Sequence, residues 1–198
     1  MSFIGGDEFH IGVSAARYFF NAIGGQGNIA IIEGPATAPT ARERLRGFHR
    51  VLREFPSLTL AGSACGHYQK PGGFEAMLTL LNSDAKIDAV IAANDLMALG
   101  ALDALAQAGK RIPVMGSNGT VEAAQAIRDG RLLASVDYDG FKMGCIAMEA
   151  MLRHLQGGAI PKEILMPATI VHSGNVAPWL VSVEQRQPPE WNAVVGHR

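Results

Sequence analysis

The chain has 198 residues, of which 48% are hydrophobic and 18% are charged, and its formal net charge at pH 7 is −1. This length fits one domain with a continuous apolar core. The near balance of 17 basic and 18 acidic residues excludes the broad basic surface that binds nucleic-acid backbones. No apolar run reaches the ~18–20 residues of a membrane span. Residues 1–6 lack the basic start and apolar core of a signal peptide, so none is expected within the given sequence.

Short apolar runs alternate with helical patterns along most of the chain, which is typical of a parallel sheet covered by helices on both faces. The expected elements, in chain order, are a strand at 3–5, a helix at 11–23, a strand at 28–33, a helix at 40–55, a strand at 58–61, a helix at 73–81, a strand at 87–92, a helix at 96–108, a strand at 112–116, a helix at 121–128 and a strand at 132–136. The sequence therefore predicts an α/β fold, a three-layer αβα sandwich with a parallel sheet. With the strands numbered from 28–33 onward, the expected strand order is 2-1-3-4-5.

The last third of the chain fits this alternation less well. The segment 141–155 has the pattern of a helix rich in Met and Ile, two short strands are expected at 164–166 and 170–172, and a polar tail begins at 176. A large apolar helix face is usually covered by a partner. We therefore expect the helix at 141–155 to mediate dimerisation or to rearrange.

Motifs for cofactors and for catalysis are absent. A phosphate-binding loop needs a lysine after its glycines, whereas the glycine-rich stretch 24–27 has none and precedes a predicted strand. No Ser lies in a Gly-x-Ser-x-Gly elbow, and the six histidines never pair at the spacing of metal ligands. Cys65 and Cys145 are far apart and form no metal-binding pattern, and their spacing leaves their disulfide state open. We therefore expect no cofactor, no metal and no catalytic residue.

Polar and aromatic side chains follow the predicted parallel strands. In an open parallel sheet, ligands bind beyond the carboxyl ends of the strands, near the point where the strand order reverses. Arg and Asn side chains hold neighbouring hydroxyl groups, and an aromatic ring covers the C–H face of a sugar. This combination indicates a small polyhydroxylated ligand. The candidate ligand-binding residues are Arg44, Tyr68, Asn94, Asn118 and Tyr138.

These residues also have structural interpretations. The alternatives are a salt bridge of Arg44 with Glu33 or Glu43, a turn role for Asn118 and a surface-loop role for Tyr68. Asp95 is expected to cap the helix at 96–108 with its side-chain oxygen. The convergence of the candidates on one edge of the sheet favours the ligand interpretation.

Several segments resemble the type I periplasmic binding proteins, specifically the ribose/galactose-type receptors of bacterial ABC importers. Those receptors are related to the effector domains of the lactose-repressor family. The resembling residues are Gly6-Asp7 with Gly12, Arg42-Glu43-Arg44 with Gly47-Phe48, the block from Ala93-Asn94-Asp95 to Gly100-Ala101-Leu102, Gly116-Ser117-Asn118-Gly119, and Phe141 with Gly144. The resemblance extends over about residues 3–175.

The resemblance implies a division of the chain. Residues 7–137 with 169–175 would form the C-terminal, ligand-binding lobe of such a receptor, residues 138–168 would cross over and pack on an N-terminal lobe, and residues 176–198 would form a polar tail. It places Arg44, Asn94, Asn118 and Tyr68 on the sugar and Tyr138 at the hinge. The family often has Asp in place of Asn118 and Gln in place of Tyr138, and these departures leave the particular sugar open.

The function that the resemblance implies is that of the substrate-binding component of a bacterial ABC-type sugar importer. Such a receptor is periplasmic and non-catalytic, closes on a small sugar and is then recognised by the ABC permease. Its expected partners are therefore the sugar, the N-terminal lobe and the permease, with a homodimer through 141–155 as a further interface and no nucleic acid. One alternative is the effector-binding domain of a lactose-repressor-family regulator, which needs a DNA-binding headpiece. Another is an enzyme on a flavodoxin-like sheet, which needs a reactive pair at the strand ends.

Overall fold

The main sheet of the computed structural model has six strands in the order β3-β2-β4-β5-β6-β8. The structure describes residues 2–195. Five strands run parallel, and β8 pairs antiparallel with β6 at one edge. The strands are β2 Gly27–Glu33, β3 Leu58–Cys65, β4 Ala89–Ala92, β5 Val114–Ser117, β6 Ala134–Asp137 and β8 Thr169–His172. The five parallel strands have the predicted order 2-1-3-4-5, so the predicted α/β sandwich is confirmed.

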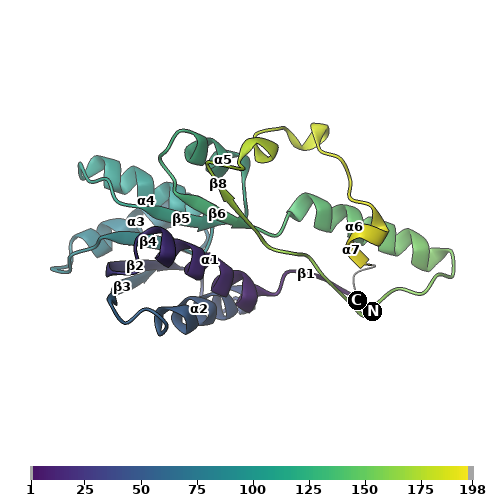
Figure 1. Cartoon of the computed structure of the whole chain (residues 1–198), viewed down its shortest axis with the longest axis horizontal. Helices are drawn as coiled ribbons and strands as arrows, with labels where there is room; N and C mark the ends of the chain where they lie inside the picture. Colours follow the sequence, from purple (N-terminus) through teal and green to yellow (C-terminus); the bar gives the residue numbers. More distant parts are fainter. Residues whose placement is uncertain (1, 196–198) are drawn as a thin grey trace.

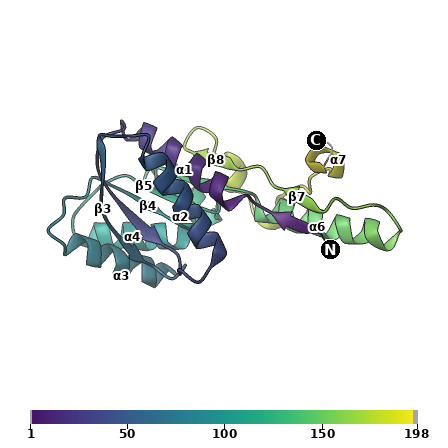
Figure 2. The same ribbon diagram turned by 90° about the horizontal axis from the view of Figure 1, so that it is seen from below.

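Helices cover both faces of this sheet. Figure 2 shows α1 and α2 on one side and α3 and α4 on the other. The helices of the main lobe are α1 Glu8–Ala22, α2 Pro39–Leu52, α3 Lys70–Leu81, α4 Asp95–Gln107 and α5 Val121–Arg128. Successive strand residues alternate between the two layers, as the pleat requires. In β2, Ile29 and Ile31 pack with α1 and α2, whereas Ala30 and Ile32 pack with α3 and α4.

Glycines allow the two helices of each pair to approach closely. A Cβ atom added to Gly47 of α2 would lie 2.6 Å from the carbonyl oxygen of Phe9 in α1, and one added to Gly12 would lie 2.4 Å from the carbonyl oxygen of Arg44. On the other face, a Cβ added to Gly100 of α4 would lie 2.1 Å from the carbonyl oxygen of Lys70. These helix crossings therefore have no room for a side chain.

A smaller extension projects from the main lobe (Figure 1). It contains α6 Gly140–Leu155 and the parallel pair of β1 Phe3–Gly5 with β7 Glu163–Leu165. Helix α6 buries Ile146 and Ala150, but Met148, Met151 and Leu155 are 63%, 56% and 74% exposed. None of the helices in residues 2–195 combines the length and the hydrophobicity that a membrane crossing needs.

The segment that follows β8 returns along the main lobe before reaching the extension (Figure 1). It forms the short 3-10 helices Ala177–Trp179 and Val183–Gln185 and the helix α7 Trp191–Val195. Val176 is buried, and Trp179 and Leu180 pack against the core between the sheet, α4 and α5. The start of the expected polar tail thus contributes apolar contacts to the main lobe.

Replacement of Gly47 by Ala is expected to destabilise the chain by about 1–3 kcal/mol, because overpacking at the crossing of α1 and α2 forces the helices apart. Gly144 of α6 provides the matched control, since a Cβ added there meets nothing within 4 Å. Gly144→Ala should leave the free energy of unfolding unchanged or raise it by up to about 1 kcal/mol. Urea denaturation of both variants measures the difference. Equal losses would show that the crossing is not tightly packed.

Candidate ligand-binding edge of the sheet

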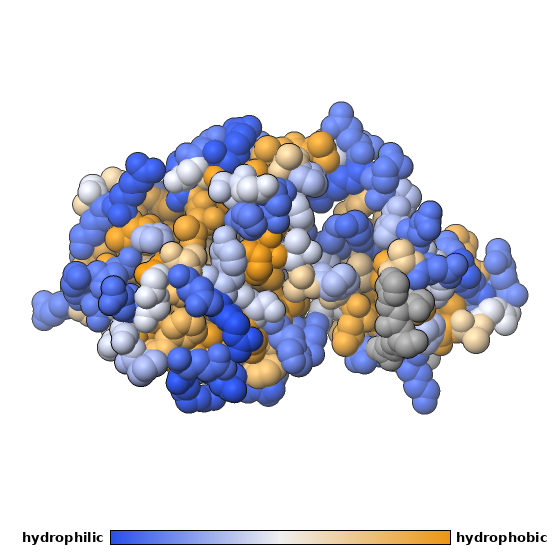
Figure 3. Space-filling model, viewed as in Figure 1, coloured by the Kyte–Doolittle hydropathy of each residue, from blue (hydrophilic) through white to orange (hydrophobic). Residues whose placement is uncertain are grey.

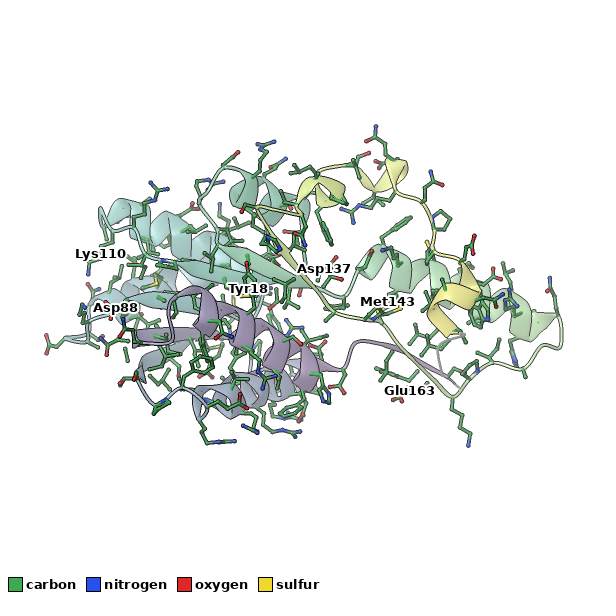
Figure 4. All side chains as sticks on the ribbon, viewed as in Figure 1. Tyr18, Asp88, Lys110, Asp137, Met143 and Glu163 are labelled. Carbon is green, nitrogen blue, oxygen red and sulfur yellow. The ribbon has the colours of Figure 1, made fainter. Side chains whose placement is uncertain are left out.

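The candidate residues lie beyond the carboxyl ends of the parallel strands. The chain passes from β2 to β3 on one side and continues with β4 on the other side of β2, so the strand order reverses between β2 and β4. This is the position at which open α/β sheets bind ligands. Because β6 leads directly into α6, the same edge faces the extension. Figure 4 shows Asp137, the last residue of β6, on this side of the main lobe.

Arg44 occupies the centre of this edge and is 3% exposed. Its Nε atom donates a hydrogen bond of 3.1 Å to Oε2 of Glu8, and Nη2 donates to the same oxygen. Its Nη1 atom donates to the carbonyl oxygen of Ala93 and lies 3.5 Å from Oδ1 of Asn118. The salt bridge of Arg44 is therefore made with Glu8 at the start of α1, and not with either glutamate considered from the sequence.

Asn94 fixes the start of α4. Its Oδ1 atom accepts a hydrogen bond of 2.9 Å from the backbone N–H of Met97, and its Nδ2 atom donates one of 3.1 Å to the carbonyl oxygen of Tyr68. The prediction that Asp95 caps this helix is wrong. Asn94 has the extended backbone of an N-cap (φ −152°, ψ 170°), while Asp95 is the first helical residue and its carboxylate bonds elsewhere.

Tyr68 lies across the end of β2. Its hydroxyl is 3.1 Å from Oγ1 of Thr40, and a Cβ added to Gly34 would lie 2.4 Å from its ring. His67 and Tyr68 both have left-handed backbone conformations, with φ of 53° and 59°. Such conformations are uncommon outside glycine, so the loop after β3 is held by its surroundings. Tyr68 is half-buried in this position.

Asn118 and Tyr138 complete the set. Asn118 has a φ of 111°, and its backbone N–H donates a hydrogen bond of 2.7 Å to the carbonyl oxygen of Val136. Burial raises the pKa of Tyr138, while the Arg44 guanidinium beside its hydroxyl opposes that rise. Arg44 therefore connects directly to Asn118 and Tyr138 and, through Ala93, to the segment that carries Asn94. The structure brings all five candidates together, although their contact with a ligand stays a prediction.

Two carboxylates are buried behind this edge. Asp95 accepts hydrogen bonds from the backbone N–H of Thr120 (2.8 Å) and from Oγ of Ser135 (2.6 Å). Burial raises its pKa to about 7, an effect that the nearby Asp137 increases. Asp137 accepts hydrogen bonds from the backbone N–H of Asp139 (2.7 Å) and from Nε1 of Trp179 (2.6 Å), and burial raises its pKa as well.

The chemistry of this edge suits binding. A guanidinium and two carboxamides supply hydrogen-bond donors and acceptors, and two tyrosines supply aromatic faces. Among residues 2–195, no group of three or more His, Cys, Asp and Glu side chains could hold a metal ion. Cys65 and Cys145 are free thiols, and Sγ of Cys65 lies 3.6 Å from Nδ1 of His67.

Comparison with known proteins identifies the family. A family model described as a periplasmic binding protein domain matches residues 1–159. The chain belongs to the periplasmic binding protein family. The ribose import binding protein of Bacillus subtilis is 33% identical over 164 residues, which cover 83% of this chain and 53% of that protein. The putative rhizopine-binding protein of Rhizobium meliloti is 29% identical over 181 residues, which cover 89% of this chain and 59% of that protein. The chain thus spans little more than half the length of these relatives.

Solved structures of this periplasmic binding protein family have the same fold. An ABC transporter solute binding protein from Bacillus halodurans with bound myo-inositol superposes with a TM-score of 0.86 at 27% identity, covering 90% of this chain and 63% of that one. A periplasmic solute binding protein from Actinobacillus succinogenes with bound D-allose gives a TM-score of 0.86 at 26% identity, and the match covers 89% of this chain and 62% of that one. The predicted family and the predicted fold of a periplasmic binding protein lobe are therefore confirmed.

Acidification from about pH 8 to about pH 5 is expected to stabilise the folded chain through Asp95. The pKa of this group is about 7 in the folded protein against an ordinary value of 3.8, so the folded state binds more protons in this window and stability falls as the pH rises through it. Asp95→Asn removes this titration. The free energy of unfolding, measured by urea denaturation at several pH values, should therefore depend less on pH in the variant. Parallel curves for the two proteins would contradict this assignment.

Proposed function

We propose that this chain is the C-terminal lobe of the substrate-binding component of a bacterial ABC-type sugar importer, and that it binds a small cyclic sugar or polyol without catalysis. The observation that carries this proposal is the meeting of Arg44, Asn118 and Tyr138 at the carboxyl edge of the parallel strands. The relatives are named as binding proteins, and the two solved structures hold D-allose and myo-inositol. Their names favour an importer receptor over a repressor effector domain or an enzyme.

Each candidate residue has a role in this proposal. Arg44 and Asn118 present donors and an acceptor to neighbouring hydroxyl groups, since a guanidinium and a carboxamide each bind two polar atoms at once. Tyr68 and Tyr138 cover the C–H faces of the ring. Asn94 holds the loop that carries Tyr68 in place, because its Nδ2 atom donates a hydrogen bond to the Tyr68 carbonyl oxygen.

The same proposal accounts for the orientation of the ligand edge. In the whole receptor the sugar would lie between this lobe and an N-terminal lobe, and residues 138–168 would pack on that second lobe. Closure around the sugar would favour the conformation that the permease recognises. Such a receptor works in the periplasm, and the matching family is described as a periplasmic binding protein domain.

An amide-resolved NMR titration with D-ribose, D-allose and myo-inositol tests the binding proposal. One lobe should bind the sugar weakly, with a dissociation constant on the order of millimolar, because the contacts from the other lobe are missing. We expect the shifts to cluster at Arg44, Tyr68 and Asn118. Asn118→Ala should abolish them, whereas Asp103→Asn on the exposed side of α4 should not. Shifts that scatter over the surface, or that survive Asn118→Ala, would contradict the proposed site.

The apolar surface of the extension, formed by Phe3, Met148, Met151, Leu152 and Leu155, should cause the isolated chain to self-associate. These side chains are 49–74% exposed, and Met151 also lines a hollow of ≈ 500 Å³ between β1 and α6. Figure 3 shows apolar residues on the visible surface of this extension. Exposed patches of this kind usually bind a partner, which here would be the N-terminal lobe in the whole receptor and a second copy in its absence.

Sedimentation velocity at increasing protein concentration measures this association. Met148→Lys should shift the chain toward the monomer, and Ala106→Lys on the exposed face of α4 serves as the control. A chain that stays monomeric at high concentration would overturn the proposed interface. Equal effects of the two variants would show that added charge alone is responsible.

A further inference from the structure

The carboxylate of Asp95 lies directly behind the loop that carries Asn118. Its Oδ2 atom accepts a hydrogen bond of 2.8 Å from the backbone N–H of Thr120, and its Oδ1 atom accepts one of 2.6 Å from the hydroxyl of Ser135. That hydroxyl oxygen in turn accepts the backbone N–H of Gly119 at 3.1 Å. Asp95 therefore binds, directly or through Ser135, both of the residues that follow Asn118.

This loop has a backbone conformation that needs such support. Asn118 has a φ of 111° and Gly119 a φ of 62°. A non-glycine residue in this region costs free energy and persists only where its surroundings determine it. The carboxylate packs directly against β5, because a Cβ added to Gly116 would lie 2.2 Å from its Oδ1 atom. Asp95 is also fully buried, so water does not replace these hydrogen bonds.

We propose that Asp95 is a positioning residue for ligand binding, which holds the Asn118–Thr120 loop so that the side chain of Asn118 meets Arg44 at the sugar site. This inference rests on the proposed sugar-binding function and adds to it a residue that does not contact the sugar. Hydrogen bonds to an ionised carboxylate are shorter and stronger than those to a neutral group. The ionised form of Asp95 therefore holds the loop more firmly than the protonated form, in which one oxygen is a hydroxyl and accepts hydrogen bonds more weakly.

The groups that face Asp95 come from every element packed against it. Thr120 at the start of α5 and Ser135 of β6 are neutral donors, Gly116 of β5 presents only its backbone, and Asp137 at the end of β6 is the second buried carboxylate. Arg44 of α2 reaches the carbonyl oxygen of Ala93, two residues before Asp95. Protonation of Asp95 should weaken sugar binding while it stabilises the fold, so the two properties should change in opposite directions with pH.

Amide-resolved NMR of the wild-type chain between about pH 5 and about pH 8.5, with and without the tightest-binding of D-ribose, D-allose and myo-inositol, tests this inference. We expect the Gly119 and Thr120 amide signals to titrate together, and the sugar dissociation constant to rise about tenfold on the acidic side of their midpoint. Asp95→Asn should bind about tenfold more weakly than the wild type above that midpoint and show no pH dependence. Asp103→Asn, on the exposed side of the same helix, should behave as the wild type.

The outcomes separate this inference from the proposed function. If the sugars bind but the dissociation constant does not follow the Thr120 titration, Asp95 does not position the loop. If none of the sugars binds at any pH, the proposed function fails first and this inference fails with it. If Asp95→Asn does not fold, Ser135→Ala replaces it. This variant removes the bridge to Gly119 and should weaken binding while the Thr120 amide still titrates, and unchanged binding would overturn the inference.

Discussion

The guanidinium of Arg44 is a cation buried at the ligand edge, and the surrounding elements are arranged to satisfy it. A buried charge is costly unless it is paired and fully hydrogen-bonded. Glu8 supplies the opposite charge, and the Ala93 carbonyl and the Asn118 side chain accept further hydrogen bonds. Glu8 reaches Arg44 because α1 and α2 cross closely where Gly12 packs on the Arg44 backbone. The crossing of α1 and α2, the strand ends and the ligand edge thus meet at one ion pair.

The ligand edge has two kinds of side chains, which act at different depths. Arg44 and Asn94 are buried and make most of their hydrogen bonds to other groups of the protein, so they determine where the loops lie. Tyr68, Asn118 and Tyr138 are half-buried and lie nearer the surface. Asp95 is deeper still and connects α4 to the loop of Asn118. A site built in this way orders its binding groups before the ligand arrives, which lowers the entropic cost of binding.

Much of the fold follows from local patterns in the sequence, and the contacts of the site do not. The apolar runs and helix patterns predict the parallel strands, whose order 2-1-3-4-5 is the one expected for such a sheet, and the position of Asn118 after a strand predicts its place at the edge. The partner of Arg44 is Glu8, 36 residues away, and only the crossing of α1 over α2 brings the two together. Asp95 has the chemistry of a helix cap, yet Asn94 takes that role because the helix begins at Asp95, one residue earlier than the sequence pattern predicts. Long-range packing decides both cases.

A crystal structure of the chain with the sugar that binds most tightly in the titration tests the central claim most directly. The account predicts a ring hydroxyl within hydrogen-bond distance of the Arg44 guanidinium and of the Asn118 carboxamide, with the ring against Tyr68 or Tyr138. The Arg44–Glu8 ion pair and the bond from Thr120 to Asp95 should be retained in that complex. A sugar bound away from this edge, or one that contacts neither Arg44 nor Asn118, would contradict the account.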